Sequence, residues 1–140
     1  VLLGAVIAAY LPSLLAGVER RVMPYGWQFQ LALEVLQQLH RVRAAPDKGL
    51  TLAQLAALLR VDPLHLEPVL ESLTALDWIG LLNEVQSGVE ARFVLLADPD
   101  STRMEPLLHR LLLQRDASTQ NLWDKGRWAE LTMRDVLLNQ

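Results

Sequence analysis

Three acidic residues in one short segment could do chemistry together. Asp98, Asp100 and Glu105 lie in the stretch DPDSTRME. Carboxylates that converge on one or two divalent cations support metal-assisted hydrolysis of phosphodiesters. Aspartates between a predicted strand and a predicted helix are also typical turn formers and caps. We favour the turn and capping role for this group over a metal site.

The histidines offer no further catalytic group. His40, His65 and His109 fall on three different predicted helices, and none has the paired ligand spacing of an HExxH motif. The chain contains no cysteine, which excludes a thiolate zinc site and a disulfide scaffold. No nucleophile elbow, phosphate loop or dinucleotide fingerprint occurs either. The sequence predicts no cofactor, metal or catalytic residue here, and it leaves open whether a longer protein would be an enzyme.

The first predicted element of the chain is an uncharged N-terminal segment. Residues 1–18 contain no charged side chain, and Glu19, Arg20 and Arg21 follow. As a helix this segment would span roughly 27 Å, close to the hydrocarbon thickness of a bilayer. We expect 1–22 to be the end of a transmembrane helix with its basic flank, and the chain to be a fragment of a longer protein. The alternative is an ordinary buried helix that Pro12 kinks.

A basic pair directly after an apolar run indicates that the residues from about 22 onward are cytoplasmic. The residues expected to contact the membrane are Leu2, Leu3, Val6, Ile7, Leu11, Arg20 and Arg21.

Residues 23–97 predict three helices and two strands. Apolar residues recur at helical spacing in the first helix, from Leu31 to Val42, and in the second, from Leu52 to Leu59. The third helix begins after Asp62 and buries the stripe from Leu66 to Leu76. Two short strands, WIGLLNEV and ARFVLLA, follow with a turn at Ser87 and Gly88. This order is typical of a winged helix-turn-helix with a two-stranded wing.

Local capping signals fix two of these helix starts. Thr51 and Gln54 fit a capping box at the start of the second helix, and Leu50 is placed to pack on Leu55. Asp62 can cap the third helix, with Pro63 at its first position. Pro68 cannot donate a backbone hydrogen bond, so we expect a loose first turn or a regular helix that begins nearer Glu67.

Residues 98–140 predict a C-terminal helical extension. The segment MEPLLHRLLLQR has so wide an apolar face that it would be buried on two sides, either within one core or partly against a second copy or neighbouring element. Trp123 and Trp128 favour anchoring of the tail on the domain over a place at a membrane interface. Thr132 and Asp135 could cap one more short helix. The whole fold class is therefore mainly α with a small β-hairpin.

The apolar segment with LLGA, the basic pair, and the stretches TLAQLAALLRVD and LDWIG together resemble the ribonuclease BN-like family of bacterial inner-membrane proteins, the YihY type. The resemblance covers roughly residues 1–115. It implies that the chain holds the end of the last transmembrane helix and the cytoplasmic tail of a transfer-RNA processing protein. Val6 departs from the acidic residue that many relatives carry after LLGA.

Charge along the third helix and wing argues against a nucleic-acid partner. The chain has 13 basic and 16 acidic residues, but from Val61 to Ala91 it has six acidic residues and no Lys or Arg. A DNA-reading helix needs basic side chains on phosphates, and Arg92 alone does not supply them. The residues that this helix would present are Leu64, His65, Glu67 and Glu71.

We expect those four residues to contact a protein. The favoured function is a non-catalytic winged-helix tail of an integral inner-membrane protein that acts through a protein partner or self-association. The alternatives are part of a membrane-associated ribonuclease BN-like protein and a soluble winged-helix transcription regulator. The regulator would bind DNA in a salt-dependent way, and the nuclease part would bind RNA and depend on divalent metal.

Overall fold

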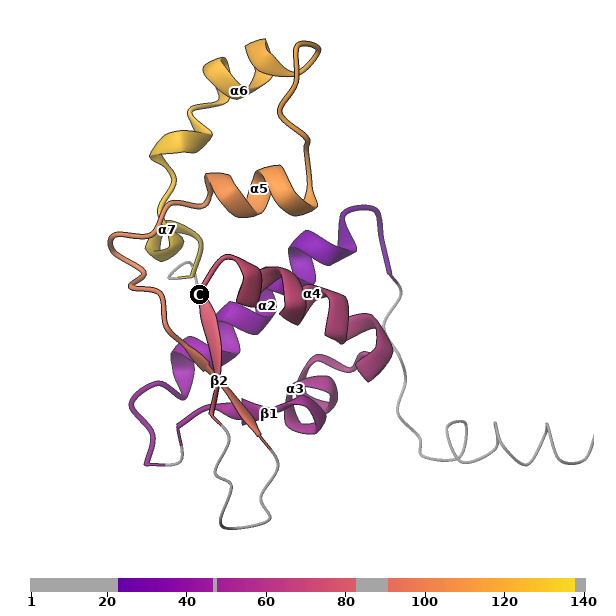
Figure 1. Cartoon of the computed structure of the whole chain (residues 1–140), viewed down its shortest axis with the longest axis vertical. Helices are drawn as coiled ribbons and strands as arrows, with labels where there is room; N and C mark the ends of the chain where they lie inside the picture. Colours follow the sequence, from indigo (N-terminus) through magenta and orange to yellow (C-terminus); the bar gives the residue numbers. More distant parts are fainter. Residues whose placement is uncertain (1–22, 47, 83–90, 138–140) are drawn as a thin grey trace, which may run out of the picture.

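The computed structural model describes residues 23–46, 48–82 and 91–137. The described chain is mainly helical with one small antiparallel sheet (Figure 1). This arrangement confirms the predicted winged helix-turn-helix with additional C-terminal helices. The elements in chain order are α2 (Trp27–Arg41), β1 (Leu50–Thr51), α3 (Leu52–Leu59), α4 (Pro63–Ala75), β2 (Ile79–Leu82), β3 (Arg92–Leu95), α5 (Glu105–Leu111), α6 (Gln120–Gly126), the 3-10 turn η1 (Trp128–Glu130) and α7 (Met133–Leu137).

Helix α2 lies at the centre of the molecule. It contacts α3, α4 and β3 on the winged-helix side, and α5 and α7 of the C-terminal extension. Its inner stripe is almost completely buried because apolar residues recur at three- and four-residue spacing. The buried residues are Leu31, Ala32, Val35, Leu36 and Leu39. One core cluster therefore joins the winged helix to the extension.

The capping box at the start of α3 is confirmed. The Thr51 hydroxyl accepts from the Gln54 backbone N–H at 3.1 Å, and the Gln54 side chain accepts from the Thr51 N–H at 2.9 Å. Two orphan donors of the helix start are satisfied in this way. Leu55 is fully buried beneath this turn, whereas Leu52, which we expected in the buried stripe, is only half-buried.

Helix α4 begins earlier than Pro68 led us to expect. It runs without interruption from Pro63, so the prediction that the regular helix begins nearer Glu67 is wrong. Asp62 closes the first turn because its carboxylate accepts from the Leu64 N–H at 2.9 Å and its carbonyl accepts from the His65 N–H at 2.9 Å. This cap and the buried stripe on the inner side of α4 outweigh the one backbone hydrogen bond that Pro68 cannot make.

The end of α4 turns the chain directly into the sheet. Asp77 adopts a left-handed conformation with φ of 59°. Its N–H donates to the Thr74 carbonyl, and the Trp78 N–H donates to the Leu73 carbonyl at 3.1 Å. These two bonds form a Schellman motif, in which Trp78 and Leu73 are both buried. Strand β2 therefore starts at a fixed angle to α4.

The sheet has one strand more than the predicted hairpin. Its order is β1-β3-β2, and both pairings are antiparallel. Gly49, directly before β1, allows the third strand to form. Its φ of 87° favours glycine, and the Cβ of any other residue at this position would lie only 2.4 Å from the Phe93 carbonyl oxygen. The predicted turn at Ser87 and Gly88 lies outside the described residues.

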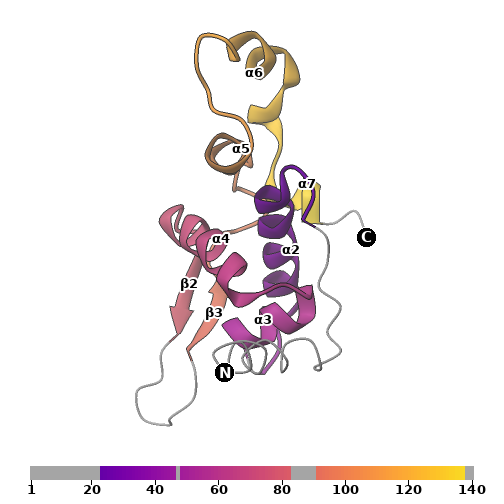
Figure 2. The same cartoon turned by 90° about the vertical axis from the view of Figure 1, so that its right-hand side faces the viewer.

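The C-terminal extension projects from the end of the winged helix (Figures 1 and 2). The Met104 N–H donates to the Leu131 carbonyl at 2.9 Å, and the Met133 N–H donates to the Thr102 carbonyl at 2.8 Å, so the tail returns to the loop before α5. Thr132 and Asp135 cap α7 reciprocally, as predicted.

The apolar residues of the extension divide between core and surface. Met104, Leu107 and Leu108 are buried, whereas Leu112 is half exposed. Trp123 is buried and meets Trp128 edge-on with ring centroids 4.8 Å apart. The Trp123 ring also lies 6.3 Å from the His109 ring, centroid to centroid, so this packing holds the tail to α5. That the tryptophans anchor the tail on the winged-helix domain stays a prediction.

Candidate protein-contact groove

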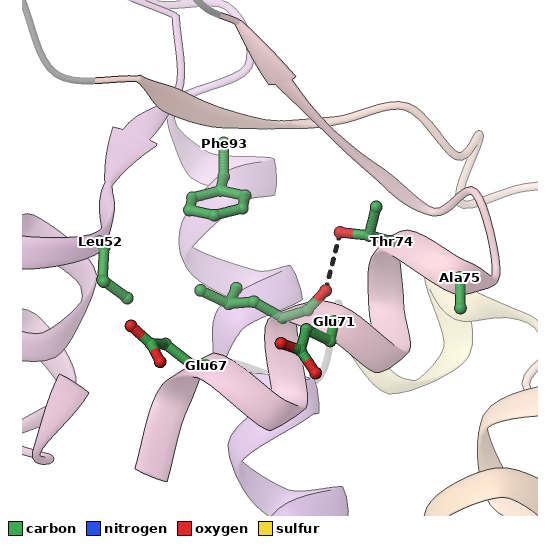
Figure 3. A pocket seen from close by; sticks show the side chains of 7 residues that line it. Leu52, Glu67, Glu71, Thr74, Ala75 and Phe93 are labelled. Atoms are coloured by element: carbon green, nitrogen blue, oxygen red, sulfur yellow. Dashed lines mark hydrogen bonds between the residues drawn. The ribbon is translucent and has the colours of Figure 1, made fainter. Parts of the chain in front are cut away.

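A groove lies between α4 and the sheet. It has a volume of about 520 Å³ and is lined from α4, β3 and the first residue of α3. Figure 3 shows Leu52 and Phe93 opposite the α4 side chains, with Glu67 reaching toward Leu52. We call it the α4–β3 groove. Its lining residues are Leu52, Glu67, Leu70, Glu71, Thr74, Ala75 and Phe93.

Helical periodicity places the two glutamates on one stripe of α4. Residues four apart on a helix have Cβ atoms roughly 5–6 Å apart, so the Glu67 and Glu71 carboxylates stand one turn from each other. Both residues are exposed. Within the described part of the chain neither forms a salt bridge. The groove thus has an acidic border along α4.

The floor of the groove is apolar. Leu70 is buried at 3% exposure, and Leu52 and Phe93 are half-buried against the core. The Thr74 hydroxyl donates to the Leu70 carbonyl at 2.8 Å, so it adds little free hydrogen-bonding capacity (Figure 3). An apolar floor beside unpaired carboxylates suits an apolar side chain flanked by cations.

The four predicted interaction residues are all exposed, but only two of them line the groove. Leu64 is 73% exposed and lies one turn before Glu67 on the same stripe. His65 points elsewhere, because its ring meets Trp27 of α2 edge-on with centroids 5.7 Å apart. The structure therefore brings Glu67 and Glu71 together and separates His65 from them.

Sequence reasoning missed the residues opposite α4. Leu52 and Phe93 come from distant parts of the chain and meet because β1 pairs with β3, placing Leu50 opposite Phe93. The available signal was the apolar run in ARFVLLA, which predicts a strand but does not say which element Phe93 faces.

The carboxylates first considered as metal ligands have separate roles. Asp98 forms a turn by accepting from the Asp100 N–H and the Ser101 hydroxyl, both at 3.2 Å. Asp100 pairs with Arg134, and Glu105 pairs with Arg115 at 2.6 Å. Across the described residues no group of three or more His, Asp or Glu side chains is arranged to hold a metal ion.

The histidines are equally scattered. His40 is on α2, His65 is on α4, and His109 is on α5, where its Nδ1 accepts from the Arg115 N–H at 3.1 Å. The His109 ring also lies 6.3 Å from the ring of Trp123, centroid to centroid. His109 thus closes the end of α5 and supports the tail.

The predicted membrane contacts from Leu2 to Arg21 lie outside the described residues. In the ranges that the structure does describe, no helix combines the length and apolar character needed to cross a bilayer.

Comparison with known proteins finds close relatives among membrane proteins. The chain is 66% identical over 137 residues to a UPF0761 membrane protein of Albidiferax ferrireducens, covering 98% of this chain and 33% of that protein. It is 64% identical to a UPF0761 membrane protein of Verminephrobacter eiseniae, covering 98% of this chain and 34% of that protein. The chain thus spans about a third of the length of these relatives. No family model matches it.

Several solved structures share the fold of this chain. Oxidised CymR of Staphylococcus aureus has a TM-score of 0.56 at 13% identity and covers 86% of this chain and 98% of that one. CymR of B. subtilis, described as the global cysteine regulator, has a TM-score of 0.55 at 12% identity, covering 87% of this chain and 99% of that one. IscR of T. potens has a TM-score of 0.51 at 17% identity, with 84% and 85% covered. At these identities the likeness concerns the fold.

Proposed function

We propose that this chain is the winged-helix part of an inner-membrane protein of the UPF0761 kind, and that it acts by contacting protein rather than by catalysis. The similarity to UPF0761 membrane proteins over 98% of the chain supports the membrane setting. The basic pair Arg20 and Arg21 supports a cytoplasmic winged helix. The family resemblance through LLGA and LDWIG agrees with both.

The acidic border of α4 is the observation that carries the protein-contact role. In a winged helix that reads DNA, the third helix enters the major groove and basic side chains neutralise phosphates. Here the corresponding helix presents Glu67 and Glu71 without salt-bridge partners in the described chain. No Lys or Arg occurs in the sequence from Val61 to Ala91. Such a surface repels a duplex.

A catalytic role would need reacting groups that converge, and the candidate acids and histidines do not. Asp98, Asp100 and Glu105 each serve a turn or an ion pair. We therefore propose that any chemistry performed by the longer relatives resides outside these residues.

An amide NMR titration of the 140-residue chain in neutral detergent tests this proposal. Duplex DNA and then transfer RNA are added at low salt, where electrostatic binding is strongest. We expect no localised shifts on α4 or at Arg92. Shifts there that fade as salt is raised would contradict the proposal and favour a nucleic-acid role. Magnesium-dependent shifts with transfer RNA would favour the nuclease role instead.

A further inference from the structure

We infer that the α4–β3 groove binds a basic amphipathic helix from a protein partner. The partner helix would place apolar side chains on the groove floor and arginine or lysine opposite Glu67 and Glu71. This inference rests on the proposed protein-contact function and adds the chemistry of the partner.

The apolar part of the surface is larger than the groove itself. A neighbouring hollow shares Leu52 and Phe93 with the groove and continues to Pro63 and Leu81. Leu81 is 53% exposed although it pairs with Phe93 across the sheet. The two hollows adjoin at these shared residues, so the apolar surface beside α4 extends to Leu81 of β2. A helix lying along that surface could bury successive side chains at three- and four-residue spacing.

The acidic border suits a helical partner in particular. Glu67 and Glu71 are four residues apart on α4. Two cationic side chains four residues apart on a partner helix have the same spacing as Glu67 and Glu71, so each can contact one carboxylate at the same time. The two glutamates need not leave an existing salt bridge, because neither has one within the described chain.

Charge excludes the other classes of occupant. Among the described residues, no Lys, Arg or His lines the groove or the neighbouring hollow. Nucleic acids and anionic lipid headgroups would meet two carboxylates and no compensating cation, and an acidic peptide would be repelled likewise. A basic peptide gains both charge complementarity and apolar burial.

Fluorescence anisotropy with a defined probe tests the inference. The probe is a fluorescein-labelled peptide of about 18 residues, roughly 27 Å long as a helix. Leucines occupy one face at three- and four-residue spacing, with arginines four apart beside them. A second peptide carries glutamate in place of each arginine. We expect the 140-residue chain in neutral detergent to bind the arginine peptide and to leave the glutamate peptide free.

Two double variants of equal net charge distinguish binding at the groove from a general effect of the net charge of the chain. We expect Glu67→Gln with Glu71→Gln to weaken arginine-peptide binding roughly two- to thirtyfold, the range for two exposed charge pairs. Asp124→Asn with Glu130→Gln changes two exposed acids on the extension and should leave binding unchanged. Equal weakening in both double variants, or no binding at low salt, would overturn the inference.

The result also distinguishes this inference from the proposed function. If neither nucleic acid nor the arginine peptide binds, the groove inference fails while protein contact through another surface survives. If nucleic acid binds on α4, the proposed function itself fails.

Discussion

Arg134 of α7 donates hydrogen bonds to both carboxylate oxygens of Asp100, 34 residues earlier, with 2.7 Å between Nη2 and Oδ2. This pair joins the end of the extension to the loop that precedes α5. It also occupies one of the three acids that the sequence offered as metal ligands, so the same carboxylate serves structure instead of chemistry.

Replacing Asp100 by alanine should have a small effect. The side chains of Arg134 and Asp100 are 45% and 58% exposed, and exposed ion pairs contribute about 0–1 kcal/mol. We expect the free energy of unfolding to fall by no more than about 1 kcal/mol, measured by denaturant titration. Mn²⁺ should leave the Tm of the unaltered chain and of Asp100→Ala unchanged. A rise in Tm with Mn²⁺ that Asp100→Ala abolishes would show that the acids bind metal after all.

The capping box predicts a larger effect at Thr51. Thr51→Ala removes the hydroxyl that accepts from the Gln54 N–H, and such losses cost about 0.5–2 kcal/mol. Thermal unfolding followed by circular dichroism should show a lower Tm. Thr51→Ser keeps the acceptor and should retain most of the stability. Equal losses in the two variants would mean that the methyl group, not the cap, matters.

Two leucines of α4 form a matched pair. Leu73 is fully buried, whereas Leu64 is 73% exposed. We expect Leu73→Ala to reduce the free energy of unfolding by about 2–5 kcal/mol because it leaves a cavity. Leu64→Ala should change it by less than about 0.5 kcal/mol. A costly Leu64→Ala, measured in the same denaturant titration, would contradict the exposure of Leu64 in this chain.

The cap of α7 should depend on pH. The backbone N–H of Thr132, which donates to the Asp135 carboxylate, lowers the pKa of Asp135 below its ordinary value of 3.8. Because the folded pKa is the lower one, the contribution is present above 3.8 and is lost as pH falls through the lowered value. Hydrogen exchange of the α7 amides should accelerate relative to the other helices over that window.

An Asp135→Asn variant is the control for the pH effect, because its side chain does not titrate there. A carboxyl carbon NMR titration of Asp135 that gave a midpoint at or above 3.8 would contradict the assignment.

Features fixed within a few residues were predictable from the sequence. The caps at Thr51, Asp62 and Thr132 each involve a partner two or three residues away, so their residue types alone identify them. The helical stripes and the exposed glutamates of α4 follow from periodicity in the same way.

Features that depend on distant pairing were not predictable. Strand β1 has two residues, too few for an alternation pattern, and exists because Phe93 and Arg92 lie beside it. The groove floor needs Leu52, Leu70 and Phe93 from three elements. The contact between His65 and Trp27 likewise joins two helices. Tertiary packing decides each of these, and no local pattern encodes it.

Thr51 couples the stability of the wing to that of α3. Thr51 ends β1, which pairs with β3, and the same residue caps α3. Pulling the wing away from the body would break the strand pairing at the very residue that holds the helix start. Opening of the sheet and fraying of α3 should therefore occur as one cooperative event. The backbone around Leu52 and Phe93 is rigid for the same reason.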